Sequence, residues 1–234
     1  MLGLKNKIKK KKSKLDTMGR KLIAFSESKS IIAEQFRMIR TNIKYAMPDT
    51  DLKTILVTST ITGEGKSTNA ANLGVVFAQE GKKVMIVDAD MRKPTLHQTF
   101  GIFNTVGLST ILSKQDEFYR AIQETPIVGL HVIPSGPIPP NPAELLSSRT
   151  FSAFLEEMKK VYDMIIFDAP PLLSVTDAQI LSHQCDGTLL IIHSGVVEKE
   201  DVVKAHSILN SSQAKILGVV LNQYKMPKNQ KYYY

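Results

Sequence analysis

The sequence predicts an α/β fold, with a doubly wound, mostly parallel sheet and helices on both of its faces. Short apolar segments alternate with helix-forming segments along most of the chain, which is the pattern of strand–helix–strand units. The apolar segments are rich in Val, Ile and Leu with few polar interruptions, as expected for strands buried on both faces. A chain of 234 residues is long enough for one such domain with a complete core, and no second domain is required.

Basic residues are concentrated near the N-terminus. Seven of the 30 Lys and Arg residues fall within residues 5–14, and the 23 that remain nearly balance the 22 acidic residues. This argues against a nucleic-acid-binding face on the domain, so no nucleic-acid partner is expected. The arm fits a solvated flexible segment, which we favour, or a weak contact with anionic lipid. We divide the chain into a basic arm (1–20), a domain (21–223) and a flexible tail (224–234).

Several classes of site are excluded by composition. The single cysteine, Cys185, rules out an internal disulfide and a multi-cysteine metal site. The five histidines show no spacing typical of metal ligands. No apolar run approaches the ~20 residues that cross a bilayer, and the basic start lacks the apolar core of a secretory signal. We therefore expect a cytoplasmic protein that reaches a membrane only through its arm or a partner.

The first predicted helix spans about residues 30–45 and is amphipathic. Its apolar side chains recur at helical spacing, at Ile32, Phe36, Ile39 and Ile43. Beside them every third residue is charged, at Glu34, Arg37 and Arg40. From the residues alone this charged stripe indicates a solvated face with weak ion pairs.

A strand at 52–57 and a helix at 69–79 flank a loop that predicts a phosphate site. Its last six residues are Gly63, Glu64, Gly65, Lys66, Ser67 and Thr68. Glycines let backbone amides close around a polyphosphate, a lysine reaches the β and γ oxygens, and the next hydroxyl can ligate Mg²⁺. Thr60 stands where the pattern G-x-x-x-x-G-K-[ST] has its first glycine, so the flanking strand and helix strengthen the prediction.

Aspartates follow two of the later apolar strands. The strand at 83–87 ends in Asp88 and Asp90, and the strand at 164–167 ends in Asp168. The carboxyl ends of parallel strands are where open α/β sheets bind ligands. Carboxylates at this edge are suited to holding Mg²⁺ beside a bound nucleotide.

The other predicted elements complete the alternation. A Pro-rich turn at 135–146 enters a helix, and it reads either as a stiff connector or as a wall beside the nucleotide site. The remaining predictions are short helices at 107–112 and 116–122, a strand at 130–134, a helix at 176–183, a strand at 187–192, a helix at 198–209 and a last strand at 215–221 that ends at Asn222. The tail is polar and ends in three of the seven tyrosines, Tyr232, Tyr233 and Tyr234.

Four stretches together resemble the bacterial tyrosine kinases of capsule and exopolysaccharide synthesis, which have a P-loop NTPase fold. They are residues 62–68, residues 88–94 (Asp-Ala-Asp-Met-Arg-Lys-Pro), the turn at 135–146 and residues 167–171 (Phe-Asp-Ala-Pro-Pro). The related septum-site and partition ATPases carry an extra lysine in K-G-G-x-G-K-T, where this chain has Ile61 and Thr62, and are disfavoured. The nitrogenase iron-protein branch needs cluster-binding cysteines that one cysteine cannot supply.

The resemblance implies that the chain binds ATP and Mg²⁺. Lys66 would neutralise the β and γ phosphates, while the loop backbone cradles them. Ser67, with one or both of Asp90 and Asp168, would hold Mg²⁺. Asp88 would accept the proton of the tyrosine hydroxyl, although the roles of Asp88 and Asp90 are open to exchange. Asn222 would contact the adenine.

The resemblance also implies a function and partners. The chain would be an ATP-dependent protein-tyrosine kinase that phosphorylates its three terminal tyrosines in trans and regulates polysaccharide synthesis. Glu34, Arg37 and Arg40 match the family's E-x-x-R-x-x-R element, which implies a ring-shaped homo-oligomer. A separate transmembrane activator would hold the chain at the inner face of the membrane, and a tyrosine phosphatase is expected as a further partner. The alternative is a P-loop ATPase switch that organises a membrane-associated complex without phosphorylating protein.

Overall fold

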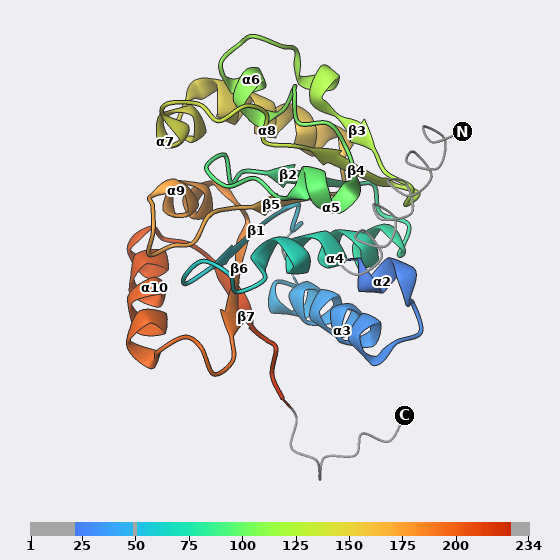
Figure 1. Cartoon of the computed structure of the whole chain (residues 1–234), viewed down its shortest axis with the longest axis vertical. Helices are drawn as coiled ribbons and strands as arrows, with labels where there is room; N and C mark the ends of the chain where they lie inside the picture. The colour runs from blue at the N-terminus through green and yellow to red at the C-terminus, as the bar shows by residue number, and fades with distance from the viewer. Residues whose placement is uncertain (1–21, 49–50, 226–234) are drawn as a thin grey trace, which may run out of the picture.

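The computed structural model of the protein describes residues 22–48 and 51–225, which form a seven-stranded sheet with flanking helices (Figure 1). The strand order is β3-β4-β2-β5-β1-β6-β7, and every pairing is parallel except that of β3 with β4. The strands are β1 (Thr54–Ser59), β2 (Val84–Asp88), β3 (Gln123–Glu124), β4 (Leu130–Ile133), β5 (Met164–Asp168), β6 (Gly187–His193) and β7 (Ile216–Asn222). The predicted mostly parallel sheet is confirmed, whereas the basic arm and the terminal tyrosines lie outside the described residues.

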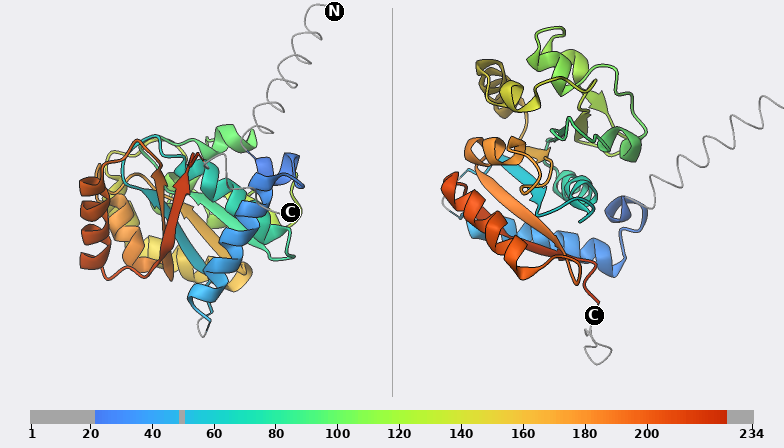
Figure 2. Two further views of the ribbon diagram at one scale, coloured as in Figure 1. Left: turned by 90° about the horizontal axis from the view of Figure 1, so that it is seen from below. Right: turned by 60° about the vertical axis from the view of Figure 1, so that its left-hand side comes forward.

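Helices cover both faces of the sheet. One face carries α2 (Ile23–Ser26), α3 (Ile31–Ala46), α4 (Lys66–Ala78) and α5 (Leu96–Phe100). The other carries α6 (Leu108–Leu112), the 3-10 helix η1 (Phe118–Ala121), α7 (Pro142–Leu146), α8 (Arg149–Val161), α9 (Asp177–Gln184) and α10 (Lys199–Ser211). Figure 2 shows α3 and α10 on opposite sides of β7. The doubly wound arrangement is therefore confirmed.

The core is divided into two layers by the alternation of side chains along each strand. In β5, Ile165 and Phe167 pack beneath α8 and its neighbours, while Met164 and Ile166 pack beneath α3 and α4. Such strands are buried on both faces and lack a polar side, which is why they appear in the sequence as continuous apolar runs. The structure also contains four elements that were not predicted from the sequence, namely α2, α5, β3 and α8.

Helix α3 departs from its prediction in one position. Ser30 caps the helix, because its Oγ accepts a hydrogen bond from the Ala33 amide at 3.1 Å. The buried side chains are Ala33, Phe36 and Ile43, whereas Ile32, expected in the core, is 45% exposed. Helical spacing places Ile32 on the same face as Phe36 and Ile43, but Ile32 is only the second residue of the helix, and its side chain is left exposed in this first turn.

The charged side chains of α3 make contacts within the chain, although Nε of Arg40 is buried without a hydrogen-bond partner. Arg37 pairs with Glu34 and donates to the Ser28 carbonyl at 2.7 Å. Arg40 reaches α4, where its Nη1 donates to the Val76 carbonyl at 2.7 Å. These contacts account for the stripe without a second subunit, and its role in assembly stays a prediction. Among the helices that the structure describes, none is long and apolar enough to cross a membrane.

Candidate functional site

The loop between β1 and α4 has the backbone conformation of a phosphate cradle. Gly63 and Gly65 have φ angles of 89° and 87°, in the left-handed region that side chains disfavour. Gly65 is the N-cap of α4, and a Cβ atom there would lie 2.2 Å from Nδ2 of Asn222. The free amides at the start of a 13-residue helix attract anions. Thr60 is not among the residues with positive φ, so the missing glycine of the motif imposes no strain.

Glu64 ties this loop to the neighbouring strands. Its carboxylate is 1% exposed and accepts hydrogen bonds from the Ile61 amide at 2.7 Å and the His193 amide at 2.9 Å. Its carbonyl accepts from Nδ2 of Asn222, at the end of β7, at 2.7 Å. The side chain of Glu64 therefore holds the loop against the neighbouring strands and does not face the pocket. Asn222 contacts the loop backbone here, and its contact with adenine stays a prediction.

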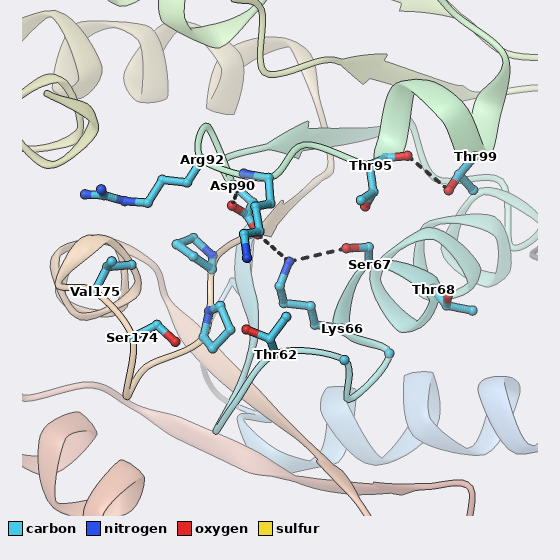
Figure 3. Close-up of a pocket in the computed structure, with 15 residues that line it drawn as sticks. Thr62, Lys66, Ser67, Thr68, Asp90, Arg92, Thr95, Thr99, Ser174 and Val175 are labelled. Atoms are coloured by element: carbon cyan, nitrogen blue, oxygen red, sulfur yellow. Dashed lines mark hydrogen bonds and ion pairs between the residues drawn. The ribbon is translucent and has the colours of Figure 1, made fainter. Parts of the chain in front are cut away.

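A pocket of about 510 Å³ lies in front of the loop (Figure 3). This volume is within the usual range for small-molecule sites. Of the predicted site residues, Gly63, Gly65, Lys66, Ser67, Thr68 and Asp90 line it, whereas Glu64, Asp88, Asp168 and Asn222 lie behind this lining. The rest of the wall is formed by Thr62, Arg92, Lys93, Thr95, Thr99, Pro170, Pro171, Ser174 and Val175.

Lys66 is held by the acidic residues that the sequence predicted beside it. Its Nζ lies 2.8 Å from Asp90 Oδ2 and 3.6 Å from Asp168 Oδ1 (Figure 3 shows the Asp90 contact). Burial lowers the pKa of Lys66, but attraction to Asp168 and Asp90 outweighs it, so the pKa lies above that of an ordinary lysine. Lys66 is therefore cationic at neutral pH and suited to bind phosphate oxygens.

Asp88 and Asp168 face each other across β2 and β5. They are partners in the strand register, and both are fully buried. Asp88 Oδ2 accepts from the amides of Thr95 and Leu96 at 3.2 and 3.0 Å, while Asp88 Oδ1 and both oxygens of Asp168 have no hydrogen-bond partner. Burial raises the pKa of both carboxyl groups, well above the ordinary range for Asp88, where repulsion from Asp168 adds to it.

These unsatisfied oxygens fit a divalent cation. Buried carboxylate oxygens without donors are stabilised by a nearby positive charge, and Mg²⁺ prefers oxygen ligands. Among the described residues, no group of three or more His, Cys, Asp or Glu side chains is arranged to hold a metal alone. Mg²⁺ commonly takes one or two carboxylates and completes its shell with phosphates and water. The donor set of Ser67, Asp90 and Asp168 is compatible with that mode of binding.

The structure adds pocket residues to which the sequence assigned no role. Arg92 forms a bidentate ion pair with Asp177, with Nε–Oδ2 and Nη2–Oδ1 distances of 2.9 and 3.0 Å. Thr95 and Thr99 reach the pocket from the unpredicted helix α5 and the residue before it. The Asp-x-Asp-x-Arg spacing after β2 was visible, but the partner of Arg92 lies 85 residues away and has no local signal.

Comparison with known proteins identifies the family. A family model described as an AAA domain matches residues 52–216. Tyrosine-protein kinase YwqD of Bacillus subtilis is 49% identical over 224 residues, which cover 96% of this chain and 94% of the relative. The crystal structure of the chimeric protein CapA2B2 superposes with a TM-score of 0.85 at 44% identity, covering 89% of this chain and 91% of that one.

A second solved structure leads to the same assignment. The kinase domain of the Escherichia coli tyrosine kinase ETK has a TM-score of 0.82 at 30% identity and covers 90% of this chain and 84% of its own. These matches confirm the predicted P-loop fold and the resemblance drawn from the motifs. The chain belongs to the family of bacterial tyrosine-protein kinases.

Proposed function

We propose that the chain transfers the γ-phosphoryl group of ATP to tyrosine hydroxyls, including Tyr232, Tyr233 and Tyr234 of another copy. The observation that carries this proposal is the buried Lys66, which lies between the phosphate loop and two aspartates at the edge of one pocket. Phosphoryl transfer needs in-line positioning and neutralisation of charge on the phosphoryl oxygens, and a lysine with backbone amides supplies both. Family membership supports tyrosine as the acceptor.

In this mechanism Lys66 exchanges its carboxylate partners for phosphate oxygens when the nucleotide binds. Ser67, Asp90 and Asp168 would hold Mg²⁺, which supplies positive charge to the phosphates. Amides of the loop and of the start of α4 orient the phosphate chain. Each of these contacts stabilises negative charge on the group that is transferred. The remaining chemical task for a protein side chain is to accept one proton.

We propose Asp88 as the group that accepts this proton. Its raised pKa favours proton uptake, as a general base requires. Asp90 is the competing candidate because it lines the pocket, whereas Asp88 lies behind that lining. Asp88→Asn should lower kcat at saturating Mg²⁺, and Asp90→Asn should raise the Mg²⁺ concentration needed for half-maximal rate. The opposite pair of results would assign the base to Asp90.

The decisive experiment combines ATP and Mg²⁺ with detection of phosphotyrosine. Wild type should gain phosphotyrosine, and both Lys66→Met and a variant with Phe at positions 232, 233 and 234 should not when each is assayed alone. Mixing the two variants should restore it on the Lys66→Met copy only, because that copy keeps the tyrosines and the other keeps the active site. ATP hydrolysis without phosphotyrosine, in the presence of a membrane activator's segment as well, would support the ATPase switch.

We also propose a homo-oligomer formed through the charged stripe of α3, Glu34, Arg37 and Arg40. Arg40 donates to α4, so Arg40→Ala removes an internal contact as well as a surface charge. Arg37 pairs with Glu34 at the surface and otherwise donates only to the exposed Ser28 carbonyl, so Arg37→Ala with Glu34→Ala disturbs the domain less. Light scattering should report a smaller mass for this variant. An unchanged mass, with unchanged thermal unfolding, would contradict the ring.

Localisation and partners complete the proposal. We propose that a transmembrane activator holds the kinase at the inner face of the membrane, that a tyrosine phosphatase reverses its phosphorylation and that the kinase regulates exopolysaccharide or capsule synthesis. The basic arm adds weak attraction to anionic lipid, worth about 1 kcal/mol per charge near the surface. Flotation with anionic liposomes, comparing the full chain with one lacking residues 2–14, tests this contribution.

A further inference from the structure

A bidentate ion pair crosses the rim of the nucleotide pocket. Arg92 follows β2 and lines the pocket, and Asp177 is the first residue of α9. Two parallel hydrogen bonds join them, at 2.9 and 3.0 Å. In Figure 3 the Arg92 side chain points away from Lys66, so this cation does not share the site of the lysine. The pair links two chain segments that are 85 residues apart.

The geometry keeps Arg92 with its partner. The Asp177 side chain is 0% exposed, and both hydrogen bonds shown for its carboxylate come from Arg92. If Arg92 moved to a bound phosphate, a fully buried carboxylate would lose its counter-ion, which is strongly unfavourable. A guanidinium fork also matches a carboxylate in a way that a single point charge does not. Arg92 is therefore a fixed part of the rim and not an arm that swings onto the nucleotide.

The segments that the pair joins carry the two aspartates beside Lys66. Asp90 lies two residues before Arg92, and its Oδ1 accepts from the Lys93 amide at 3.0 Å. Asp168 is the last residue of β5, nine residues before Asp177, which begins α9. The connection between them is fixed against β1, because Thr58 Oγ1 donates to the Pro170 carbonyl at 2.8 Å. Asp168 is thus held in the sheet between β1 and β2, and a displacement of Arg92 relative to Asp177 would shift the Asp90 segment relative to it.

We propose that Arg92 and Asp177 are positioning residues, which set Asp90 and Asp168 around Lys66 for phosphoryl transfer. The inference rests on the proposed function, because it assumes that these carboxylates serve the Mg²⁺-dependent step. Losing the pair should impair that step while leaving the phosphate loop intact. The loop is supported separately by Glu64 and Asn222.

Two near-isosteric variants test the pair. Arg92→Lys keeps the charge but not the fork, and Asp177→Asn keeps the shape but not the charge. Each should lower kcat for tyrosine phosphorylation at least tenfold, with the KM for ATP within twofold of wild type. The double variant should be no worse than the more affected single variant, because both changes break one interaction. The exposed pair Arg120 and Asp116, 2.9 Å apart, supplies matched controls as Arg120→Lys and Asp116→Asn.

A binding measurement separates this inference from the kinase proposal. Without Mg²⁺, fluorescent ADP should bind to Asp177→Asn with the same affinity as to wild type. Mg²⁺ should increase the affinity of wild type for ADP, and this increase should be at least fivefold smaller in Asp177→Asn. Three results would overturn the positioning role. They are an unchanged kcat and an unchanged effect of Mg²⁺ on ADP affinity in both single variants, losses of kcat that multiply in the double variant, and a KM for ATP that rises as kcat falls. A wild type that binds Mg-ADP normally but forms no phosphotyrosine would refute the kinase proposal alone.

Discussion

Replacing Lys66 with methionine should destabilise the nucleotide-free protein as well as abolish phosphoryl transfer. The side chains of Lys66, Asp90 and Asp168 are 11%, 6% and 0% exposed, and the lysine lies within 4 Å of both carboxylates. Removing one partner of a buried ion pair leaves an uncompensated charge and costs about 3–5 kcal/mol. For a domain of this size, that corresponds to a fall in Tm of roughly 6–20 °C.

The assay is urea and thermal unfolding of the nucleotide-free wild type and Lys66→Met between pH 5 and pH 8. Because the pKa of Lys66 is raised, its side chain stays positively charged throughout this range, and that charge is lost only as pH rises above the ordinary lysine pKa. Burial raises the pKa of the carboxyl groups of Asp88 and Asp168, so these two groups take up protons more readily as the pH falls. The difference between the two proteins should therefore shrink toward pH 5.

The matched control is Lys160→Met, which breaks the exposed pair with Glu157 and should leave the unfolding midpoint almost unchanged. Equal midpoints for wild type and Lys66→Met would refute the reasoning that Lys66 compensates buried charge. If Lys66→Met is destabilised as predicted, its loss of phosphotyrosine could result from unfolding. The kinase assay therefore needs a folding control, such as a circular dichroism spectrum of Lys66→Met at the assay temperature.

Three further outcomes follow from the same contacts. Asp88→Asn should stabilise the nucleotide-free protein by about 1–3 kcal/mol at pH 8. The raised pKa of Asp88 means that its ionised form is unfavourable in the folded protein, so the gain, measured by urea unfolding, should disappear toward pH 4. A gain that does not depend on pH would contradict this. Glu64→Gln should lower the free energy of unfolding by about 1–3 kcal/mol and raise the KM for ATP, because one of the two backbone amides that donate to Glu64 loses its acceptor. An unchanged midpoint of urea unfolding would count against this. Gly65→Ala should weaken the binding of fluorescent ADP at least tenfold. Adding Asn222→Ala should restore only part of the affinity, because it removes the clash between the new Cβ and Asn222 but leaves the alanine at a positive φ. Full recovery would show that backbone strain at residue 65 is unimportant.

The parts of the site that the sequence predicts are those with a local pattern. The phosphate loop depends on consecutive residues, and Asp88 and Asp168 follow buried strands whose apolar runs mark their ends. Parallel pairing then brings these ends to one edge of the sheet, which the strand–helix alternation already implies. This is why the predicted residues around Lys66 are close together in the structure.

The parts that were missed depend on distant partners or on weak signals. Glu64 lies within the phosphate-loop motif and was predicted to contact the nucleotide. Its carboxylate instead accepts a hydrogen bond from the amide of His193, 129 residues away, and nothing near either residue in the sequence indicates this contact. Helix α8 is different, because its buried Phe151, Phe154, Leu155 and Met158 recur at helical spacing and were available to the same reasoning. Ile32 was misplaced because helical spacing assigns it to the apolar face of α3 but does not show that this face is left exposed at the first turn.

Helix α4 connects the nucleotide site to the opposite side of the domain. Its N-terminal end forms the phosphate cradle, its residues from Asn69 to Ala78 are buried, and near its C-terminal end the Val76 carbonyl is bonded by Arg40. In an assembly built on the stripe of α3, any contact that draws Arg40 away from Val76 loosens the last turn of this helix. Subunit exchange should then alter the dissociation rate of bound nucleotide, and occupancy of the pocket should in turn alter the lifetime of the assembly.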